Sequence, residues 1–158
     1  MKAWVVYDSV HGNTEKIAQA IGAALGSQED VRVFRASARP PELPAGLDLV
    51  IVGSPTQKFR QMDVVRDFVK NIPDGALKGI RVAAFDTRFA VADMKSAIGR
   101  FFVGRFGYAA KPIAESLKKK GGELAAPPEG FFVADLEGPL KPGELQRAVD
   151  WGKKLAGG

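Results

Sequence analysis

Short stretches of continuous hydrophobic residues alternate along the chain with segments in which hydrophobic residues recur at helical spacing. The stretches at residues 3–7, 47–52 and 80–85 are too short for helices and are rich in strand-forming residues. Strands that are hydrophobic throughout are typical of parallel sheets whose two faces are both covered by helices. The pattern therefore predicts an α/β protein with a buried central sheet.

The remaining elements complete a regular alternation of strands and helices. Helical spacing is present in four segments, at residues 17–25, 64–69, 112–120 and 145–155. The alternating residues 31–34 predict an edge strand. A last strand begins at residues 123–126, is interrupted by Pro127 and Pro128, and resumes at residues 131–133. We therefore expect about five strands, with helices packed between them and the solvent.

Composition narrows the chemistry that the chain can support. Its 158 residues are expected to form a single domain, residues 1–158. The chain has no cysteine, which excludes disulfides, thiol nucleophiles and iron–sulfur clusters. Its single histidine, His11, excludes most imidazole metal sites and most histidine-based catalytic triads. We therefore expect no metal site and no catalytic side chain.

Charge and the lack of a targeting segment give expectations about partners and location. The chain has 23 lysines and arginines against 18 aspartates and glutamates, a net charge of +5. Because these basic residues are spread along the chain, we interpret them as solvated surface charge and expect no nucleic-acid partner. No hydrophobic stretch approaches the roughly 18 residues of a membrane span, and no signal peptide is visible. We expect a cytoplasmic protein.

Polar residues follow each of the three buried strands, in segments that begin at Asp8, Ser54 and Asp86. Ligands of open α/β sheets bind beyond the carboxyl ends of the strands, where the strand order reverses. The first segment precedes a helix and offers hydroxyl, amide and imidazole groups with a glycine. A helix N-terminus has free N–H groups and a partial positive charge, so it suits a phosphate. A simple helix cap by Asn13 or Thr14 would explain only one or two of these residues.

Common nucleotide-binding and hydrolase motifs are absent from the chain. It contains no Gly-x-x-x-x-Gly-Lys-Ser/Thr, no Gly-x-Gly-x-x-Gly and no Gly-x-Ser-x-Gly. These absences argue against a Walker nucleotide site, a dinucleotide-binding fold and a nucleophile elbow. A phosphorylated receiver domain would need an aspartate at the end of its central strand, where Gly53 and Ser54 stand.

The first strand, the following loop and the next helix together carry a longer pattern. Their residues read Val5-Val6-Tyr7-x-Ser9-x-x-Gly12-x-Thr14-x-x-x-Ala18-x-x-Ile21, which resembles the full flavodoxin signature. The order of the remaining elements is similar to that family over nearly the whole chain. The resemblance implies a flavodoxin-like doubly wound sheet of five parallel strands in the order 2-1-3-4-5, with helices on both faces. It also implies that one FMN is bound without a covalent bond.

Three groups of FMN-binding residues follow from the resemblance. The phosphate would be held by Ser9, Val10, His11, Gly12, Asn13 and Thr14. The loop flanking the isoalloxazine ring would contain Ser54, Pro55, Thr56, Gln57, Lys58 and Phe59. The second flavin loop would contain Asp86, Thr87, Arg88 and Phe89. Three basic residues in or next to these two ring-flanking segments would favour negative charge on the reduced flavin: Lys58, Arg60 and Arg88.

Several features depart from the usual flavodoxin pattern. His11 stands where the family usually has a hydroxyl residue, and the chain is basic where carrier flavodoxins are acidic. Trp4 and Trp151 lie in the first strand and the last helix, where we expect them to pack in the core. The flavin ring would then be stacked by one of three other aromatic residues: Phe59, Phe89 or Tyr108.

The segment at residues 88–108 is longer than the second flavin loop of the family usually is, and we expect an extended flavin-side loop with a short helix. Residues 94–106 combine hydrophobic residues at helical spacing with only basic charges. Loops of this length are often lids or binding surfaces. We expect this helix to pack on its own domain. The alternatives are a lid over the flavin, a dimer contact and a membrane-surface contact, which is the least favoured.

Three functions are compatible with the resemblance. The first is an FMN-binding electron-transfer protein whose partner is a redox protein or a small electron acceptor, with the flavin supplying the redox chemistry. The second is an FMN-dependent oxidoreductase acting on a quinone or another small acceptor, with the long loop determining specificity. The third is a flavodoxin-like binding module without redox use. We expect the first.

Overall fold

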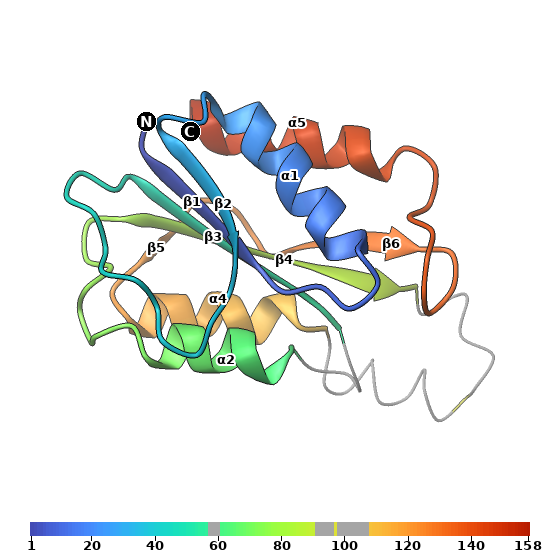
Figure 1. The fold of residues 1–158 in the computed structure, drawn as a ribbon, viewed down its shortest axis with the longest axis horizontal. Coiled ribbons are helices and arrows are strands. Elements are labelled where there is room, and N and C mark those ends of the chain that lie inside the picture. The colour runs from blue at the N-terminus through green and yellow to red at the C-terminus, as the bar shows by residue number, and fades with distance from the viewer. Residues whose placement is uncertain (57–60, 91–96, 98–107) are drawn as a thin grey trace.

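In the computed structural model the described residues are 1–56, 61–90, 97 and 108–158, and they form alternating strands and helices (Figure 1). The elements are, in chain order, β1 (Ala3–Tyr7), α1 (Asn13–Leu25), β2 (Val31–Arg35), β3 (Leu49–Pro55), α2 (Asp63–Lys70), β4 (Arg81–Phe89), α4 (Ala110–Lys119), β5 (Glu123–Leu124), β6 (Glu129–Val133) and α5 (Glu144–Gly157). The predicted alternation is confirmed. Among the helices of these described ranges, none has the length and apolar character needed to cross a membrane.

The strands form one sheet in the order β2-β1-β3-β4-β5, and the paired strands are parallel. The strand β6 also pairs with β4 in parallel, further along it than β5 does. β5 and β6 therefore share the fifth position of the sheet, separated by the segment that contains Pro127 and Pro128. The predicted order 2-1-3-4-5 is confirmed, with its fifth strand in two parts.

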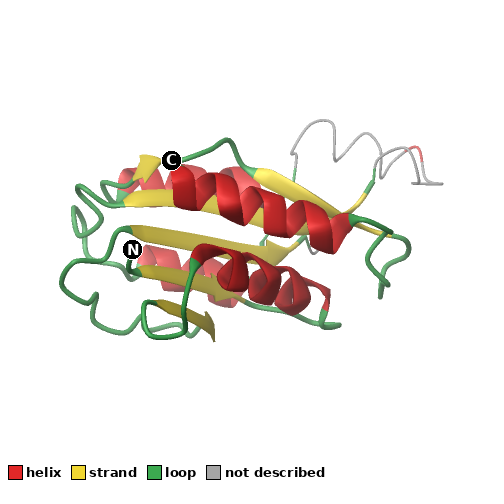
Figure 2. Ribbon diagram, turned by 90° about the horizontal axis from the view of Figure 1, so that it is seen from above, coloured by secondary structure: helices red, strands yellow, loops and turns green. Residues whose placement is uncertain are grey.

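Helices cover both faces of this sheet: α1 and α5 lie on one face, and α2 and α4 on the other (Figures 1 and 2). Each face has its own hydrophobic core, because alternate strand residues point to opposite faces. Trp4 packs edge-on against Phe34 with 5.1 Å between ring centres, and Trp151 packs against Phe85 and Phe131. Both tryptophans are buried, which confirms their predicted role in the core.

The strands β3 and β4 extend beyond the predicted ends of their hydrophobic stretches, to Pro55 and Phe89. They continue because neighbouring strands still supply backbone hydrogen-bond partners, and this outweighs the polar character of these residues. Gly53 permits the close packing of this region, since a Cβ there would lie 2.0 Å from the Phe85 ring. Part of the second and of the third predicted polar segment, which begin at Ser54 and Asp86, is therefore strand.

The two described ends of the long segment at residues 88–108 lie next to each other. Residues 91–96 and 98–107, which hold almost all of the predicted helix at 94–106, lie outside the described residues. The Tyr108 hydroxyl donates a hydrogen bond to the Phe89 carbonyl at 3.2 Å, so the two ends meet beside the carboxyl end of β4. The next helix begins at Ala110, earlier than predicted, because the Asp86 carboxylate accepts the Ala110 N–H at 2.9 Å.

Candidate functional site

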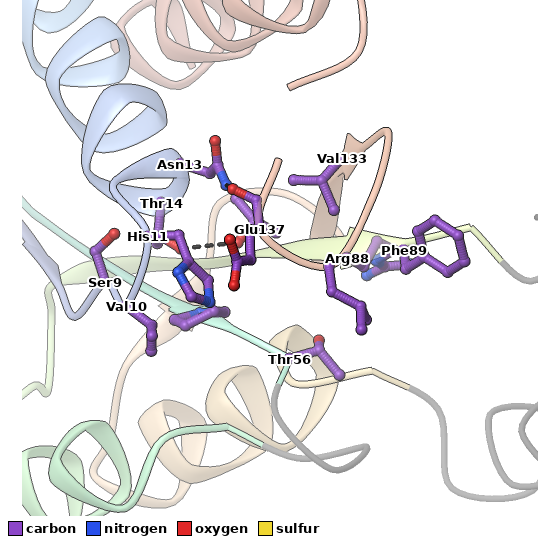
Figure 3. Close-up of a pocket in the computed structure, with 13 residues that line it drawn as sticks. Ser9, Val10, His11, Asn13, Thr14, Thr56, Arg88, Phe89, Val133 and Glu137 are labelled. Carbon is purple, nitrogen blue, oxygen red and sulfur yellow. Dashed lines mark hydrogen bonds between the residues drawn. The ribbon is translucent and has the colours of Figure 1, made fainter. Parts of the chain in front are cut away.

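A cleft of about 340 Å³ opens at the carboxyl ends of the strands (Figure 3). Four segments form its walls: the loop from β1 into α1, the ends of β3 and β4, and the turn after β6. The lining residues are Ser9, Val10, His11, Asn13, Thr14, Pro55, Thr56, Thr87, Arg88, Phe89, Val133, Leu136 and Glu137. Sites for small molecules typically enclose about 300–1,000 Å³. The fold thus brings the three predicted segments together around one cavity of suitable size.

The loop between β1 and α1 carries free backbone N–H groups next to this cleft. Gly12 is the N-cap of α1 and has a φ of 89°, a left-handed conformation that glycine adopts without strain. The Ser9 hydroxyl accepts the N–H of Gly12 at 3.0 Å and that of Glu15 at 3.4 Å. The N–H groups of Asn13 and Thr14 have no partner among the described residues. Two free donors at the positive end of a helix suit an anion.

The side chains of Asn13 and Thr14 connect this loop to other walls of the cleft instead of capping α1. Asn13 Nδ2 donates to the Glu137 carbonyl at 3.1 Å. The hydroxyl oxygens of Thr14 and Thr87 lie 2.7 Å apart and share a hydrogen bond. Both Asn13 and Thr14 are buried, so a simple helix cap does not account for them.

The end of β3 forms the second wall, through Pro55 and Thr56. Ser54 is buried and does not line the cleft. Its hydroxyl donates to the Pro55 carbonyl at 2.9 Å and accepts the Met62 N–H at 2.8 Å, so it connects the two described ends of this segment. Three predicted contacts between those ends lie outside the described residues: Gln57, Lys58 and Phe59.

Arg88 forms part of the third wall, and its charge is paired. Its Nε and Nη2 donate to the two carboxylate oxygens of Asp86 at 2.6 and 2.8 Å. The guanidinium lies 3.8 Å from the centre of the Tyr108 ring. It also fills the space that Gly130 leaves, since a Cβ on Gly130 would lie 2.2 Å from Arg88 Cζ. Arg88 is therefore a fixed cation balanced by a carboxylate, and not the free positive charge that its place in the sequence suggested.

Asp86 is fully buried beneath the cleft and does not line it. Burial is the larger influence and raises the pKa of the Asp86 carboxyl, while the hydrogen bonds from Arg88 and from the Ala110 N–H act to lower it. Each of its two oxygens has a hydrogen-bond partner, as buried polar atoms require. Asp86 thus fixes both Arg88 and the start of α4.

Of the three aromatic residues considered for stacking, Phe89 lines the cleft. Tyr108 does not line it, because its ring packs against Arg88 and its hydroxyl bonds to the Phe89 carbonyl. Phe59 lies outside the described residues. His11 is exposed at the edge of the cleft. Phe89 is therefore the described residue of the three that lines the cleft.

The end of β6 and the turn after it form a wall of the cleft that the sequence did not predict. Val133, Leu136 and Glu137 line the cleft, and the Glu137 carbonyl accepts the hydrogen bond from Asn13 (Figure 3). This wall could have been predicted, because the carboxyl end of the last strand lies at the same edge of a parallel sheet as the carboxyl ends of the other strands. The interruption at residues 127–128 obscured where that strand ends.

An open parallel sheet with a helix N-terminus facing a cleft at its carboxyl edge defines a class of α/β proteins that bind phosphate-containing ligands. The chain matches the model of the flavodoxin domain family over residues 4–125. This match covers more than half of the chain, which therefore belongs to the flavodoxin family, as the signature at residues 5–21 predicted.

Solved structures share this fold over almost the entire chain. Oxidised flavodoxin 2 from Bacillus cereus is 21% identical, with 99% of each chain covered and a TM-score of 0.72. A flavodoxin from the domain Archaea is 25% identical, with 99% of this chain and 97% of that chain covered and a TM-score of 0.65. Rubredoxin oxygen:oxidoreductase from Desulfovibrio gigas is 20% identical and has a TM-score of 0.68, but only 35% of that longer chain is covered.

Flavodoxin-family proteins bind a flavin, typically FMN, and the described residues fit this cofactor. The free N–H groups of Asn13 and Thr14, with the nearby hydroxyl of Thr14, suit a phosphate monoester. Among the described residues, and apart from its own neighbours and helix backbone, no heavy atom lies within 4 Å of the position where a Cβ of Gly12 would be. Pro55 and Phe89 offer apolar surface on two other walls.

Proposed function

We propose that the chain is an FMN-binding electron-transfer protein that holds FMN in the cleft at the carboxyl edge of the sheet. The observation that carries the proposal is the pair of free N–H groups on Asn13 and Thr14, beside a cleft that the ends of β3 and β4 complete. Membership of the flavodoxin family supports it. When bound, FMN supplies the redox chemistry, and the chain supplies binding, orientation and electrostatics.

The site residues divide into those that contact FMN and those that act through a neighbour. In this proposal the phosphate is held by residues of the first loop, namely Ser9, Val10, His11, Gly12, Asn13 and Thr14. The ring lies against Pro55 and Thr56 and against the segment at residues 87–89. Ser54 and Asp86 act indirectly, because their hydrogen bonds fix Pro55 and Arg88.

Electrons pass in this proposal between the flavin and a redox protein or a small electron acceptor. The net charge of +5 favours a partner with an acidic surface, because complementary charge speeds association.

Flavin retention and reversible reduction test the proposal directly. The purified chain is mixed with FMN or with riboflavin and then separated from free flavin by gel filtration. We expect FMN to be retained better than riboflavin, with visible absorption that bleaches on addition of dithionite and returns in air. A chain that retains no FMN, or that retains FMN without reversible reduction, would contradict the proposal.

A second function, an FMN-dependent oxidoreductase acting on a quinone or similar acceptor, is favoured by one observation. The ends of the long segment at residues 88–108 meet at Phe89, which lines the cleft, so the segment starts and finishes beside the proposed flavin site. Steady turnover of NAD(P)H or another donor with a soluble quinone by the FMN-loaded chain would support this function. Reduction of the flavin without such turnover would contradict the oxidoreductase function and support the electron-transfer function.

A further inference from the structure

We call residues 9–14, where the phosphate is proposed to bind, the phosphate loop. A side chain of the neighbouring strand β2 forms hydrogen bonds to the start of this loop. Arg35 is the last residue of the edge strand β2 and lies opposite Tyr7, the last residue of β1. Its Nη1 donates to Asp8 Oδ1 at 2.6 Å and to the Ser9 carbonyl at 2.9 Å. Arg35 therefore bonds to the first two residues after β1, where the loop begins.

Ser9 transmits this contact to the N–H groups of the loop. Its carbonyl accepts the bond from Arg35, while its hydroxyl accepts the N–H groups of Gly12 and Glu15. A movement of Ser9 would therefore disturb the backbone on both sides of Asn13 and Thr14. Because these bonds surround the two free donors, the position of Ser9 determines where those donors lie.

We propose that Arg35 is a positioning residue for phosphate binding, which holds Ser9 so that the Asn13 and Thr14 N–H groups converge on the phosphate. The inference rests on the proposed binding of FMN and adds a residue outside the cleft lining to it. Arg35 does not line the cleft itself, so it acts through Ser9 and not by contact with the ligand.

Arg35 also favours phosphate binding in a second way, because it neutralises carboxylates beside the phosphate loop. Asp8 and Glu15 place two carboxyl groups beside the start of α1, and both would repel a phosphate. Arg35 forms ion pairs with them, at 2.6 Å to Asp8 and at 3.9 Å to Glu15. Removal of Arg35 leaves both carboxylates without this cation and also releases the Ser9 carbonyl.

The overall fold depends little on Arg35. Half of its side chain is exposed, which limits what its ion pairs contribute to stability, although Asp8 itself is largely buried. Arg66 provides a matched control, since its side chain is equally exposed and also pairs with two carboxylates, those of Asp63 and Asp67. Arg66 lies in α2 and does not line the cleft.

Flavin fluorescence titrations of the wild-type chain, Arg35→Gln and Arg66→Gln separate positioning from general damage. We expect Arg35→Gln to weaken FMN binding about tenfold, the size of one charged hydrogen bond, with riboflavin affinity changed less than twofold. Arg66→Gln should change neither. Unchanged FMN affinity in Arg35→Gln, or an equal loss for FMN and riboflavin, would overturn the inference.

Salt dependence separates positioning from a remote charge effect. At about 0.5 M salt the effect of an exposed remote charge is strongly screened, whereas a misplaced loop still binds poorly. We expect the difference between wild type and Arg35→Gln to persist there. Its disappearance would overturn the positioning role.

Inorganic phosphate distinguishes failure of this inference from failure of the proposed function. We expect phosphate to raise the thermal midpoint of the flavin-free wild-type chain above its value in chloride of equal ionic strength, and Arg35→Gln to reduce this rise. A chain that binds neither flavin but shows the Arg35-dependent phosphate effect would refute the FMN proposal and support the positioning role. Absence of both effects would overturn both.

Discussion

A hydrogen bond between two threonine hydroxyls connects the start of α1 with the end of β4, two of the walls of the cleft. The Thr14 and Thr87 hydroxyls lie 2.7 Å apart in a buried position, and one of them must donate to the other. The hydrogen of the accepting hydroxyl then remains available for a phosphate oxygen. Two residues that are far apart in the chain thus supply one donor to the proposed phosphate site.

Replacement of Thr14 tests this donor. We expect Thr14→Ala to weaken FMN binding about tenfold or more, because a hydrogen bond to a charged group contributes about 1.5–3 kcal/mol. Riboflavin affinity should change much less, since riboflavin has no phosphate. Thr14→Ser keeps the hydroxyl and serves as the control. Equal losses of both flavins in a fluorescence titration would show that this loop is not the phosphate site.

Gly53 illustrates how a missing side chain determines packing. A Cβ at this position would lie 2.0 Å from the fully buried Phe85 ring, which cannot move without displacing its neighbours. We expect Gly53→Ala to lower the free energy of unfolding by about 1–3 kcal/mol, as overpacked cores do. Urea denaturation measures the loss. Gly157→Ala is the control, because no described residue outside its own helix lies within 4 Å of its Cβ position. A midpoint equal to that of wild type in Gly53→Ala would refute the packing explanation.

At the scale of elements, a charged cluster attaches α5 to β6 and so holds the turn that lines the cleft. Glu144 begins α5 and accepts the Phe132 N–H of β6 at 2.7 Å. Arg147 bonds to Glu144 at 2.7 Å, to Glu129 at 3.0 Å and to the Gly130 carbonyl. The cluster therefore fixes the relative position of both elements on either side of residues 134–143.

This cluster makes stability depend on pH. Burial raises the pKa of the Glu144 carboxyl, but the hydrogen bonds from Arg147 and the Phe132 N–H outweigh it and hold the pKa below its ordinary value of 4.5. A carboxyl with a lowered folded-state pKa stabilises the fold above its ordinary pKa, and this contribution is lost as the pH falls through the folded value. We expect Glu144→Gln to lower the urea midpoint at pH 7 and the gap from wild type to narrow below about pH 4.5.

Glu115→Gln is the control for this prediction, since Glu115 forms an exposed ion pair with Lys118 at 3.8 Å. We expect it to leave the urea midpoint nearly unchanged at both pH values. A gap between Glu144→Gln and wild type that stays constant down to pH 3 would show that the loss at pH 7 comes from packing and not from the ionised carboxylate.

For the whole molecule, the proposed ligand joins four segments that are distant in the chain. Residues 9–14, 55–56, 87–89 and 133–137 all contribute lining residues to one cleft. A ligand that contacts all four binds only the folded chain, so its binding energy adds to the stability of the domain.

Thermal denaturation in the presence of FMN tests this coupling. At about a hundred times its dissociation constant, a ligand specific for the folded state adds about 2.7 kcal/mol. We expect the thermal midpoint to rise steadily with FMN concentration and to rise less with riboflavin at the same concentration. Inosine monophosphate offers a phosphate without a flavin ring and serves as the control. An identical rise with all three ligands would contradict a dedicated FMN site.

Local patterns were sufficient for the order of elements and for the first segment of the cleft lining. Hydrophobic stretches and helical spacing arise between residues that are close in sequence, so they predicted the alternation of strands and helices and, with the flavodoxin signature, the order of the sheet. The loop at residues 9–14 was also predictable, because its hydroxyl, amide and glycine residues lie together in the chain. Trp4 and Trp151 followed from their places in a strand and a helix.

Contacts across the sheet could be determined only by the tertiary structure. The true ends of β3 and β4 depend on hydrogen bonds from neighbouring strands, so no local pattern marked them. The paired charge of Arg88 depends on how the Asp86 carboxyl is buried, and the wall formed by the turn at residues 133–137 depends on where the interrupted fifth strand ends. Arg35 reaches Ser9 across the pairing of β1 with β2. The sequence by itself thus determined the elements and the motif, whereas burial and distant pairing decided which side chains surround the cleft and which charges are neutralised.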